Sequence, residues 1–268
     1  MQDKLEDWFA EDYGKGDFTS QAVVENKLCK ASVTGGPGII SGLEICRVLL
    51  ENHNINFKTD YKDGDEISSS LILSLKGNAH DVLAIERLLL NLLSHLSGIA
   101  THTSKVVRLA RKVNSEVEIL ATRKTLPGLR DFEKAAVVHG GGQTHRMRLD
   151  DAILIKDNHL KLSGSIENSI KLSREKYPRL MLEVEADNEE QAIRIANCGA
   201  DRVMLDNFTP KEAVKTIKKL RKISNIEIEI SGGVTMGNIA KYAEFADYIS
   251  LGSLTMSLEP VDFSLHVI

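Results

Sequence analysis

The apolar residues in the first part of this chain predict both strands and helices. Leu28–Thr34 and Leu71–Leu75 are short extended runs, whereas the spacing of apolar residues in Leu43–Glu51 predicts a helix. Gly35–Gly38 and Lys62–Asp65 predict turns. Strands and helices that mix in this way indicate an α+β arrangement for about the first 100 residues.

A long stretch from Ala79 to about Val113 has apolar residues at helical spacing. The residues in this stripe are Val82, Ile85, Leu88, Leu89, Leu92, Leu93, Leu96 and Ile99. The stretch predicts an amphipathic helix that links the two parts of the chain. Gly98 follows Ser97 within it, and the sequence leaves open whether the helix is kinked or broken there.

After Val113, short apolar runs alternate with amphipathic segments. Strands are predicted at Glu118–Thr122, Ala152–Lys156, Met181–Glu185, Arg202–Asp206, Glu227–Ser231 and Tyr248–Gly252. Helices are predicted between several of them, for example at Asn188–Cys198 and Pro210–Ile223. This succession is typical of parallel β/α units.

Chemically functional residues recur at the carboxyl ends of these six predicted strands. They are Arg123, Lys124, Lys156, Asp157, Asn158, Glu183, Glu185, Asp206, Asn207, Ser231, Gly232, Gly233, Gly252 and Ser253. The active site of a β/α barrel forms at this end of its strands, from several strands at once. An open doubly wound sheet would bring fewer strand ends together, so the pattern favours a barrel.

Length and composition narrow the class of protein. A chain of 268 residues, 42% hydrophobic and 27% charged, is typical of a globular protein with one barrel-sized domain or two smaller ones. A net charge of −4 without a general basic stripe argues against nucleic acid as the main partner. The first residues do not resemble a signal peptide, no apolar run predicts a membrane span, and three cysteines without CxxC spacing fit reduced thiols. We expect a cytoplasmic protein.

Positive charge is concentrated between residues 122 and 159, which contain seven Lys or Arg against five Asp or Glu. Gly140–Gly142 lie in the same window, and their missing side chains would let a ligand approach the backbone. Arg123 suits bidentate binding of a carboxylate or phosphate, and Lys156, at the end of an apolar run, needs an anion nearby. The window predicts a pocket for a highly anionic small molecule.

Carboxylates on the later strands predict a possible Mg²⁺ site. Glu183 and Glu185 alternate on one strand and therefore share a face, and Asp206 ends a later strand. Carboxylates on neighbouring barrel strands can hold Mg²⁺ through a few oxygens. An internal ion pair between one of the glutamates and Lys124 or Lys156 explains the pattern equally well.

Two glycine turns end the last two predicted strands. Ser231-Gly232-Gly233 and Gly252-Ser253 offer backbone N–H groups near helix starts, which is the usual phosphate position in such barrels. Two such turns in consecutive units favour phosphate binding over tight geometry alone.

These segments together resemble the quinolinate phosphoribosyltransferase family, also called nicotinate-nucleotide pyrophosphorylase (carboxylating). The matching motifs are Gly16-Asp17-Phe18-Thr19-Ser20, Glu86-Arg87, Asn91, Leu96–Thr101, the 122–159 window, Glu183-Val184-Glu185, Leu205-Asp206-Asn207, Ser231-Gly232-Gly233, Ser250 and Gly252. The resemblance implies an α/β fold with an N-terminal α/β sandwich domain, residues 1–104, followed by an incomplete (open) β/α barrel, residues 105–268. The tail 260–268 alternates in polarity and could return to the N-terminal domain.

The family reaction joins quinolinate to 5-phosphoribosyl-1-pyrophosphate (PRPP). It releases pyrophosphate and CO₂ and leaves nicotinate mononucleotide, an intermediate of NAD biosynthesis. The resemblance further implies a homodimer or higher homo-oligomer in which Arg87 reaches the neighbouring active site. By the same resemblance, the residues that hold the two carboxylates of quinolinate are Arg123, His145, Arg146 and Lys156.

The resemblance also divides the remaining site residues by role. Lys124, Glu185 and Asp206 would handle the donor and its Mg²⁺, with Glu185 and Asp206 as the metal ligands. The donor phosphate would bind at Ser231, Gly232, Gly233, Gly252 and Ser253. The expected catalytic residues are Lys124, Lys156, Glu185 and Asp206.

Two other functions remain open at the level of sequence. A relative with the same fold and donor could use a different acceptor, as implied for proteins associated with molybdate transport. A Mg²⁺-dependent aldolase or isomerase acting on a sugar phosphate could use Lys156 as a base or Schiff-base amine. The number of cations favours quinolinate over a monocarboxylate such as nicotinate, because a single acid group would leave cations unpaired.

Overall fold

The computed structural model describes residues 2–68 and 70–268, which form two compact units. The first unit contains the chain up to Ser104 together with residues 135–141 and 258–268. The second unit contains residues 105–134 and 142–257. Two later segments of the chain therefore belong to the first unit.

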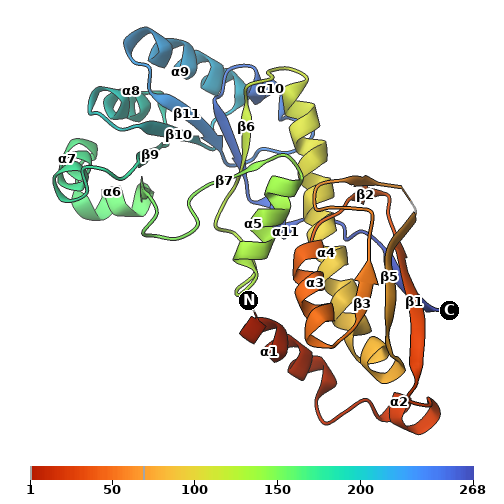
Figure 1. Ribbon diagram of the computed structural model, residues 1–268. Coiled ribbons are helices and arrows are strands. Elements are labelled where there is room, and N and C mark those ends of the chain that lie inside the picture. The colour runs from red at the N-terminus through yellow and green to blue at the C-terminus, as the bar shows by residue number, and fades with distance from the viewer. Residues whose placement is uncertain (1, 69) are drawn as a thin grey trace. The chain divides into compact units, whose positions relative to one another are not determined.

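The first unit contains an antiparallel sheet with helices (Figure 1). Its strands are β1 (Leu28–Gly35), β2 (Gly38–Ile39), β3 (Asn56–Lys58), β4 (Glu66–Ile67), β5 (Ser70–Asn78) and β13 (Phe263–Val267). Its helices are α1 (Gln2–Tyr13), α2 (Phe18–Val23), α3 (Leu43–Asn52) and most of α4 (Ala79–Arg111).

The second unit contains the parallel strands and most of the later helices. Its strands are β6 (Glu118–Ala121), β7 (Gln143–Thr144), β8 (Ile153–Ile155), β9 (Leu182–Ala186), β10 (Arg202–Asp206), β11 (Glu227–Ser231) and β12 (Tyr248–Leu251). Its helices are α5 (Arg130–His139, of which residues 135–139 belong to the first unit), α6 (Asp157–Ser163), α7 (Ile166–Lys176), α8 (Glu189–Asn197), α9 (Pro210–Ile223), α10 (Ala240–Ala243) and α11 (Ser253–Met256).

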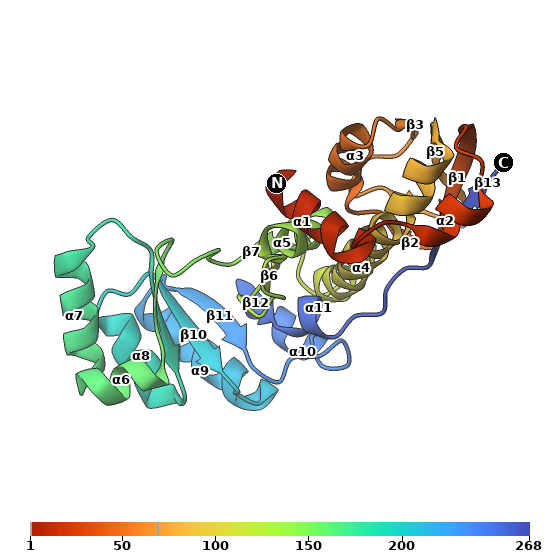
Figure 2. The ribbon, with the colours of Figure 1, turned by 90° about the horizontal axis from the view of Figure 1, so that it is seen from below.

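Four strands of the first unit form one sheet in the order β13-β1-β5-β3. In this sheet Ala31 pairs with Leu75 and Val33 pairs with Leu73, which places four buried apolar side chains on one face. Figures 1 and 2 show α3 and the beginning of α4 beside this sheet. The predicted two-layer α/β sandwich is confirmed, and β13 adds the C-terminal segment to it by pairing with β1.

Gly98 does not break α4, which continues as one helix from Ala79 to Arg111. A Cβ atom at Gly98 would lie 2.7 Å from the carbonyl oxygen of Glu259 and 3.0 Å from Cα of Pro260. The N–H of Val261 also donates to the carbonyl of Ser94 on the same helix, at 3.2 Å. Glycine is therefore required at position 98 because the returning C-terminal segment packs directly on α4.

By length and composition, α4 is the one helix among the described residues that could cross a membrane, and 61% of its most apolar window is buried inside the structure. The expectation that no segment of this kind exists was therefore wrong. Packing accounts for the apolar composition, because the side chains of Ile85, Leu89, Leu93 and Ile99 are fully buried.

The second unit contains a seven-stranded parallel sheet in the order β7-β6-β12-β11-β10-β9-β8. Strands β8 to β12 are adjacent in chain order, and β12 then pairs with β6, as in a closing barrel. In the part of the chain that the structure describes, no pairing joins β7 to β8. The predicted incomplete barrel is therefore confirmed, with its opening between these two strands.

All six predicted barrel strands are present, whereas β7 was not predicted. Its residues, Gln143 and Thr144, are exposed and polar, so they give no apolar signal. The predicted helix at Pro210–Ile223 has the same bounds as α9. It begins with a capping box in which Thr209 and Glu212 each accept from the other's backbone N–H, and Pro210 follows at the first helical position.

The close approach at Gly98 gives a test of the C-terminal return. We expect Gly98→Ala to lower the free energy of unfolding by about 1–3 kcal/mol, because the added methyl group overlaps the backbone of residues 259–260. The control is Gly237→Ala, where the nearest atom, Oγ1 of Thr235, would lie 3.7 Å away. Urea unfolding of both variants measures the difference, and equal midpoints would contradict the packing role of Gly98.

Candidate active site

The carboxyl ends of the barrel strands surround a cavity of about 780 Å³, lined entirely by residues of the second unit. This volume is in the range of small-molecule sites. The predicted site residues that line it are Arg123, Lys124, His145, Arg146, Lys156, Asp206, Ser231, Gly232, Gly233, Gly252 and Ser253. The structure therefore brings together residues that are spread over 130 positions of the sequence.

Two predicted site residues do not line this cavity. Glu185 is buried on β9 and contacts the cavity residue Lys156, whereas Arg87 is exposed on α4 in the first unit. Gly140–Gly142 do not line it either. A Cβ atom at Gly140 would overlap the carbonyl of Ala100 on α4, so the expectation that this glycine serves a ligand was wrong; it permits close helix packing instead.

Two arginines give the cavity unpaired positive charge. Nε of Arg123 is buried and has no hydrogen-bond partner among the described residues. Arg146 donates from Nη1 to the carbonyl of Ala152 at 3.1 Å, and burial together with the nearby charge of Arg123 lowers its pKa. Two guanidinium groups close enough to repel each other favour an anion between or beside them.

Lys124 lies three residues beyond the end of β6, and its side chain fills the space left by Gly252. A Cβ atom at Gly252 would lie 2.6 Å from Cδ of Lys124 and 3.4 Å from its Nζ. The backbone of Lys124 is held as well, because its carbonyl accepts from Oγ1 of Thr255 at 2.5 Å. Gly252 thus leaves room for the lysine that faces the cavity.

The two glycine turns differ in their surroundings. Gly252 and Ser253 lie at the start of α11, as expected, but Ser231–Gly233 are followed by a turn, and α10 begins only at Ala240. Gly232 and Gly233 have positive φ values of +76° and +64°. A side chain at Gly232 would also overlap Asn207, so this turn requires glycine for geometry as well as for access to its N–H groups.

An ion pair joins two of the expected catalytic residues. Nζ of Lys156 lies 2.5 Å from Oε2 of Glu185, whose side chain is buried, while the lysine remains partly exposed to the cavity. The alternative interpretation of an internal ion pair is therefore present in the structure. It does not remove Glu185 from metal binding, because a carboxylate has a second oxygen.

Glu185 and Asp206 fit the donor set that Mg²⁺ prefers. They lie on neighbouring strands, with Met204 of β10 paired to Glu185 of β9. One oxygen of Glu185 contacts Lys156, and Oδ2 of Asp206 accepts from the amide of Asn207 at 2.6 Å. Burial raises the pKa of Asp206, against the opposing charge of Lys156. Each group retains another oxygen, and Mg²⁺ binds through one or two carboxylates when phosphates and waters complete its coordination.

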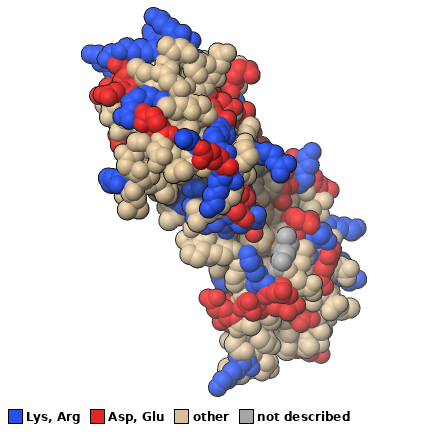
Figure 3. Space-filling view, turned by 90° about the vertical axis from the view of Figure 1, so that its left-hand side faces the viewer, with Lys and Arg blue, Asp and Glu red and all other residues tan. Residues whose placement is uncertain are grey.

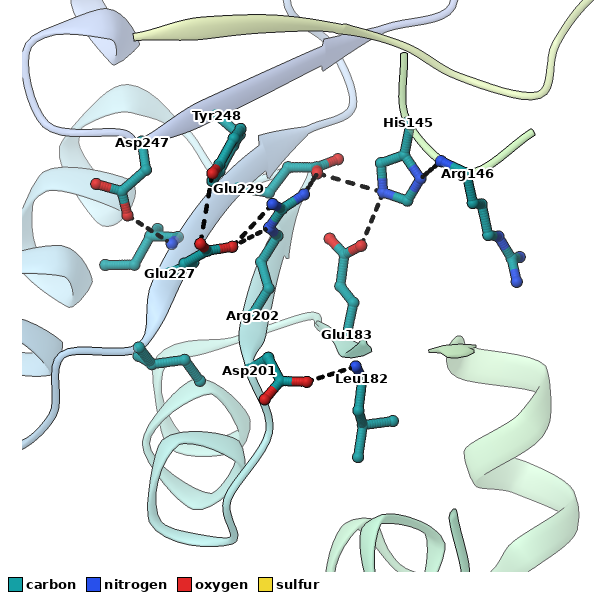
Figure 4. A network of polar contacts seen from close by, with 12 residues as sticks. His145, Arg146, Leu182, Glu183, Asp201, Arg202, Glu227, Glu229, Asp247 and Tyr248 are labelled. Carbon is teal, nitrogen blue, oxygen red and sulfur yellow. Dashed lines mark hydrogen bonds and ion pairs between the residues drawn. The ribbon is translucent and has the colours of Figure 1, made fainter. Parts of the chain in front are cut away.

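A buried network of charged groups adjoins the cavity through His145 and Glu229, which both line it (Figure 4). Nε2 of His145 lies 2.7 Å from Glu183 and 3.4 Å from Glu229, and both glutamates are fully buried. Arg202 approaches Glu229 at 3.4 Å and stacks over the ring of Tyr248 at 3.7 Å from its centroid. The side chains of His145, Glu183 and Glu229 are close enough together to hold a metal ion, but Arg202 already supplies a positive charge beside them.

The network retains a proton that an exposed glutamate would release. Burial, and then the charge of Glu229, raises the pKa of Glu183 to about 7. Burial alone would lower the pKa of His145, but the hydrogen bonds to Glu183 and Glu229 outweigh it and raise that pKa to about 9. Nδ1 of His145 accepts the N–H of Arg146 at 2.7 Å, which opposes a second proton on the ring. His145 and Glu183 therefore share the additional proton across their 2.7 Å contact.

This geometry changes what His145 can do. Both ring nitrogens contact protein groups, so in this arrangement neither is free to bind a substrate carboxylate. Sequence reasoning also missed Glu229, which lines the cavity. The available signal was its position between Ile228 and Ile230 in a predicted strand, because a glutamate in an apolar strand of this kind points into the barrel.

One face of the molecule carries mixed surface charge. Figure 3 shows one face on which Lys and Arg alternate with Asp and Glu, without a broad basic stripe. This is the distribution expected for a protein that concentrates positive charge only at a small-molecule site.

An open β/α barrel whose strand ends gather cations, carboxylates and glycine turns defines an enzyme that acts on anionic, phosphorylated small molecules. The chain belongs to the quinolinate phosphoribosyltransferase family. The model of quinolinate phosphoribosyl transferase, N-terminal domain, matches residues 17–97, and that of the C-terminal domain matches residues 99–266.

Similar proteins cover nearly the full chain. A probable nicotinate-nucleotide pyrophosphorylase [carboxylating] of Archaeoglobus fulgidus is 42% identical over 94% of this chain and 98% of its own length. The protein with the same description in Methanothermobacter thermautotrophicus is 38% identical over 100% of this chain and 99% of its own. The crystal structure of NadC from Streptococcus pyogenes has a TM-score of 0.92 and 35% identity, covering 99% of this chain and 96% of that one.

The raised pKa of Glu183 predicts a pH dependence of stability. The folded pKa of about 7 lies above the reference value of 4.5, so the folded state binds more protons between these values and the free energy of unfolding falls as pH rises from 4.5 to 7. We expect Glu183→Gln, which stays neutral, to gain stability relative to the unmodified protein over this range. Urea unfolding at pH 5 and pH 8 measures the change.

The control for this experiment is Glu175→Gln, an exposed position on α7. Its stability difference from the unmodified protein should stay constant between the two pH values. If Glu183→Gln also shows a constant difference, burial does not raise the pKa of Glu183 in the folded protein.

Proposed function

We propose that the chain catalyses phosphoribosyl transfer from PRPP to the ring nitrogen of quinolinate. The products are nicotinate mononucleotide, pyrophosphate and CO₂, in NAD biosynthesis. Family membership over the full chain and relatives described as carboxylating nicotinate-nucleotide pyrophosphorylases support this reaction.

The observation that carries the choice of acceptor is the excess of positive charge at the cavity. Lys156 pairs with Glu185, and Lys124 would face the leaving pyrophosphate, so the guanidinium groups of Arg123 and Arg146 remain as two positive charges for the acceptor. Glu229, the other carboxylate that lines the cavity, faces Arg202. A dicarboxylate such as quinolinate balances this excess, whereas nicotinate would leave one cation unpaired.

In this reaction the protein acts through position and charge. Arg123, with a buried donor that lacks a partner, and Arg146 would bind the acceptor carboxylates and hold the pyridine nitrogen toward C1 of the donor. The nitrogen forms a bond to C1 as the bond to pyrophosphate breaks. Lys124, which faces the cavity over Gly252, would offset negative charge on the leaving group.

Decarboxylation follows from the first step. Transfer of the phosphoribosyl group leaves a positive charge on the ring nitrogen, which stabilises the carbanion formed when the adjacent carboxylate departs as CO₂. A proton then replaces the carboxylate on that carbon. No covalent nucleophile on the protein is required.

We further propose that Mg²⁺ is the cofactor and that Glu185 and Asp206 hold it. When bound, it would offset the charge of the pyrophosphate. The glycine turns at Ser231–Gly233 and Gly252-Ser253 would bind the phosphate of the donor through backbone N–H groups. Nζ of Lys156 contacts Glu185 and is therefore not free to attack a carbonyl carbon, which disfavours the Schiff-base chemistry of an aldolase.

The first experiment follows nicotinate mononucleotide and CO₂ after incubation with PRPP, Mg²⁺ and quinolinate, with nicotinate replacing quinolinate in a parallel reaction. We expect product from quinolinate alone, and loss of product when a chelator removes Mg²⁺, with recovery on adding it back. If neither acceptor gives product although the protein still binds PRPP, the protein would instead be a relative that uses another acceptor. Equal turnover of nicotinate would reject the dicarboxylate site.

We also propose a cytoplasmic homodimer, or a higher homo-oligomer, in which each active site receives Arg87 from the neighbouring subunit. Arg87 is exposed on α4 and is absent from the cavity lining of its own second unit, as this arrangement requires. The family resemblance supplies the role of the residue.

Subunit mixing tests this arrangement. Arg87→Ala and Lys124→Ala should each be nearly inactive alone, whereas co-expression should restore roughly a quarter of full activity, because half of the dimers are mixed and each has one intact site. Arg47→Ala, exposed on α3 and paired with Glu44 and Glu51, is the matched control and should remain active alone. No recovery in the mixed protein would place Arg87 in its own subunit's site or outside the site.

A further inference from the structure

Lys134 on α5 is a fully buried lysine with an unusual set of partners. Its Nζ donates to the carbonyl of His145 at 2.9 Å and to the carbonyl of Arg146 at 2.8 Å. Among the described residues, it forms no ion pair with a carboxylate. A charged group in this position must have a structural or functional reason, because a buried ammonium without a counter-ion is unfavourable.

The carbonyls held by Lys134 belong to the segment that carries two predicted site residues. Arg130, one helical turn before Lys134 on α5, donates to the next carbonyl, that of Met147, at 3.1 Å. Three consecutive carbonyls therefore accept bonds from two cations of one helix. In an extended strand, successive carbonyls point to opposite sides, so this segment is not a strand; β7 indeed ends at Thr144.

This irregular backbone determines where the neighbouring side chains point. The ring of His145 turns toward Glu183, while the guanidinium of Arg146 reaches the carbonyl of Ala152 at the cavity. Without Lys134, the carbonyls of His145 and Arg146 would lose their buried donor. Either would then have to rotate toward another partner, and the side chains of both residues would move with the peptide planes.

The charges around Lys134 point to the same site. Burial, and then the positive charge of Arg130, lowers the pKa of Lys134 to about 8, with Arg123 and Arg146 also adding to the repulsion and Asp151 opposing it. Lys134 is thus part of the concentration of positive charge beside the cavity. A bound dianion would relieve this repulsion without touching the lysine.

We propose that Lys134 is a positioning residue of the acceptor site, which aims Arg146 by holding the carbonyls of His145 and Arg146. This inference rests on the proposed function, because the acceptor is taken to be quinolinate. Lys134 does not touch the acceptor itself. Its effect should therefore appear in acceptor affinity and should depend on Arg146.

The first test compares Lys134→Met with the unmodified protein. Methionine keeps the approximate length and packing of the lysine but removes its hydrogen bonds and charge. We expect the KM for quinolinate to rise roughly 10- to 100-fold, since a misplacement of about 1 Å can cost on the order of 100-fold. The KM for PRPP should stay within about twofold. Lys171→Met, exposed on α7, is the matched control and should change neither value.

A double-mutant cycle separates positioning from general destabilisation. Arg146→Ala alone should weaken quinolinate saturation by roughly 30-fold or more, as expected for loss of a partner from a buried charge pair. Adding Lys134→Met to Arg146→Ala should raise the KM for quinolinate only a few-fold further, because the residue that Lys134 aims is gone. Full additivity of the two effects would overturn the proposal.

Other outcomes are equally decisive. An unchanged quinolinate KM in Lys134→Met, or an equal rise in both KM values, would contradict a role in the acceptor site. If Lys134→Met does not fold, Lys134→Arg keeps the charge and donors, and the proposal requires it to alter the KM for quinolinate more than that for PRPP. The activity of the unmodified protein tests the proposed function separately. If the unmodified protein is inactive, that function is rejected. If it is active and Lys134→Met has the same KM for quinolinate, only the role of Lys134 is rejected.

Discussion

The site depends on one constraint, which is the repulsion between the positive charges that line its cavity or lie next to it. Arg123 and Arg146 lie close enough to affect each other, and Lys134 adds a third charge behind them. Such an arrangement is unfavourable for folding unless the protein fixes each group elsewhere or a ligand neutralises it. The bonds from Lys134 and Arg130 to carbonyls, and from Arg146 to Ala152, fix the groups without neutralising them. Positive charge is thereby preserved for an anionic substrate.

The negative groups of the barrel are distributed so that they do not cancel this charge. Glu183 and Glu229 lie deeper, where His145 and Arg202 balance them (Figure 4). Glu185 pairs with Lys156 at the cavity edge, on the side where the metal is proposed to bind. Glu183 and Glu185 are two residues apart on β9, so their side chains lie on the same face of the strand but at different depths of the barrel. This difference in depth explains why the two glutamates have different partners.

Most of the fold could be predicted from the sequence because most of its elements had a local signal. The six barrel strands were apolar runs, and α9 had its capping box and proline. β7 was missed because two exposed polar residues have no periodicity. The return of residues 258–268 to the first unit could be suspected from alternation, but its contact with Gly98 depends on tertiary packing, which no local pattern encodes. The same is true of Gly140, which appeared to serve a ligand and instead packs against α4.

The site was predictable as a set of residue types, but not in its connections. Arg123, Lys124 and Lys156 could be placed at the cavity because each lies within three residues of the carboxyl end of a strand. The orientation of His145 could not, because it depends on Glu229, 84 positions later, and on a break in extended geometry maintained by Lys134. Long-range polar contacts of this kind have no spacing in the sequence. These contacts fix the charge of the site and the orientation of its side chains, and so they determine which anion the site can bind.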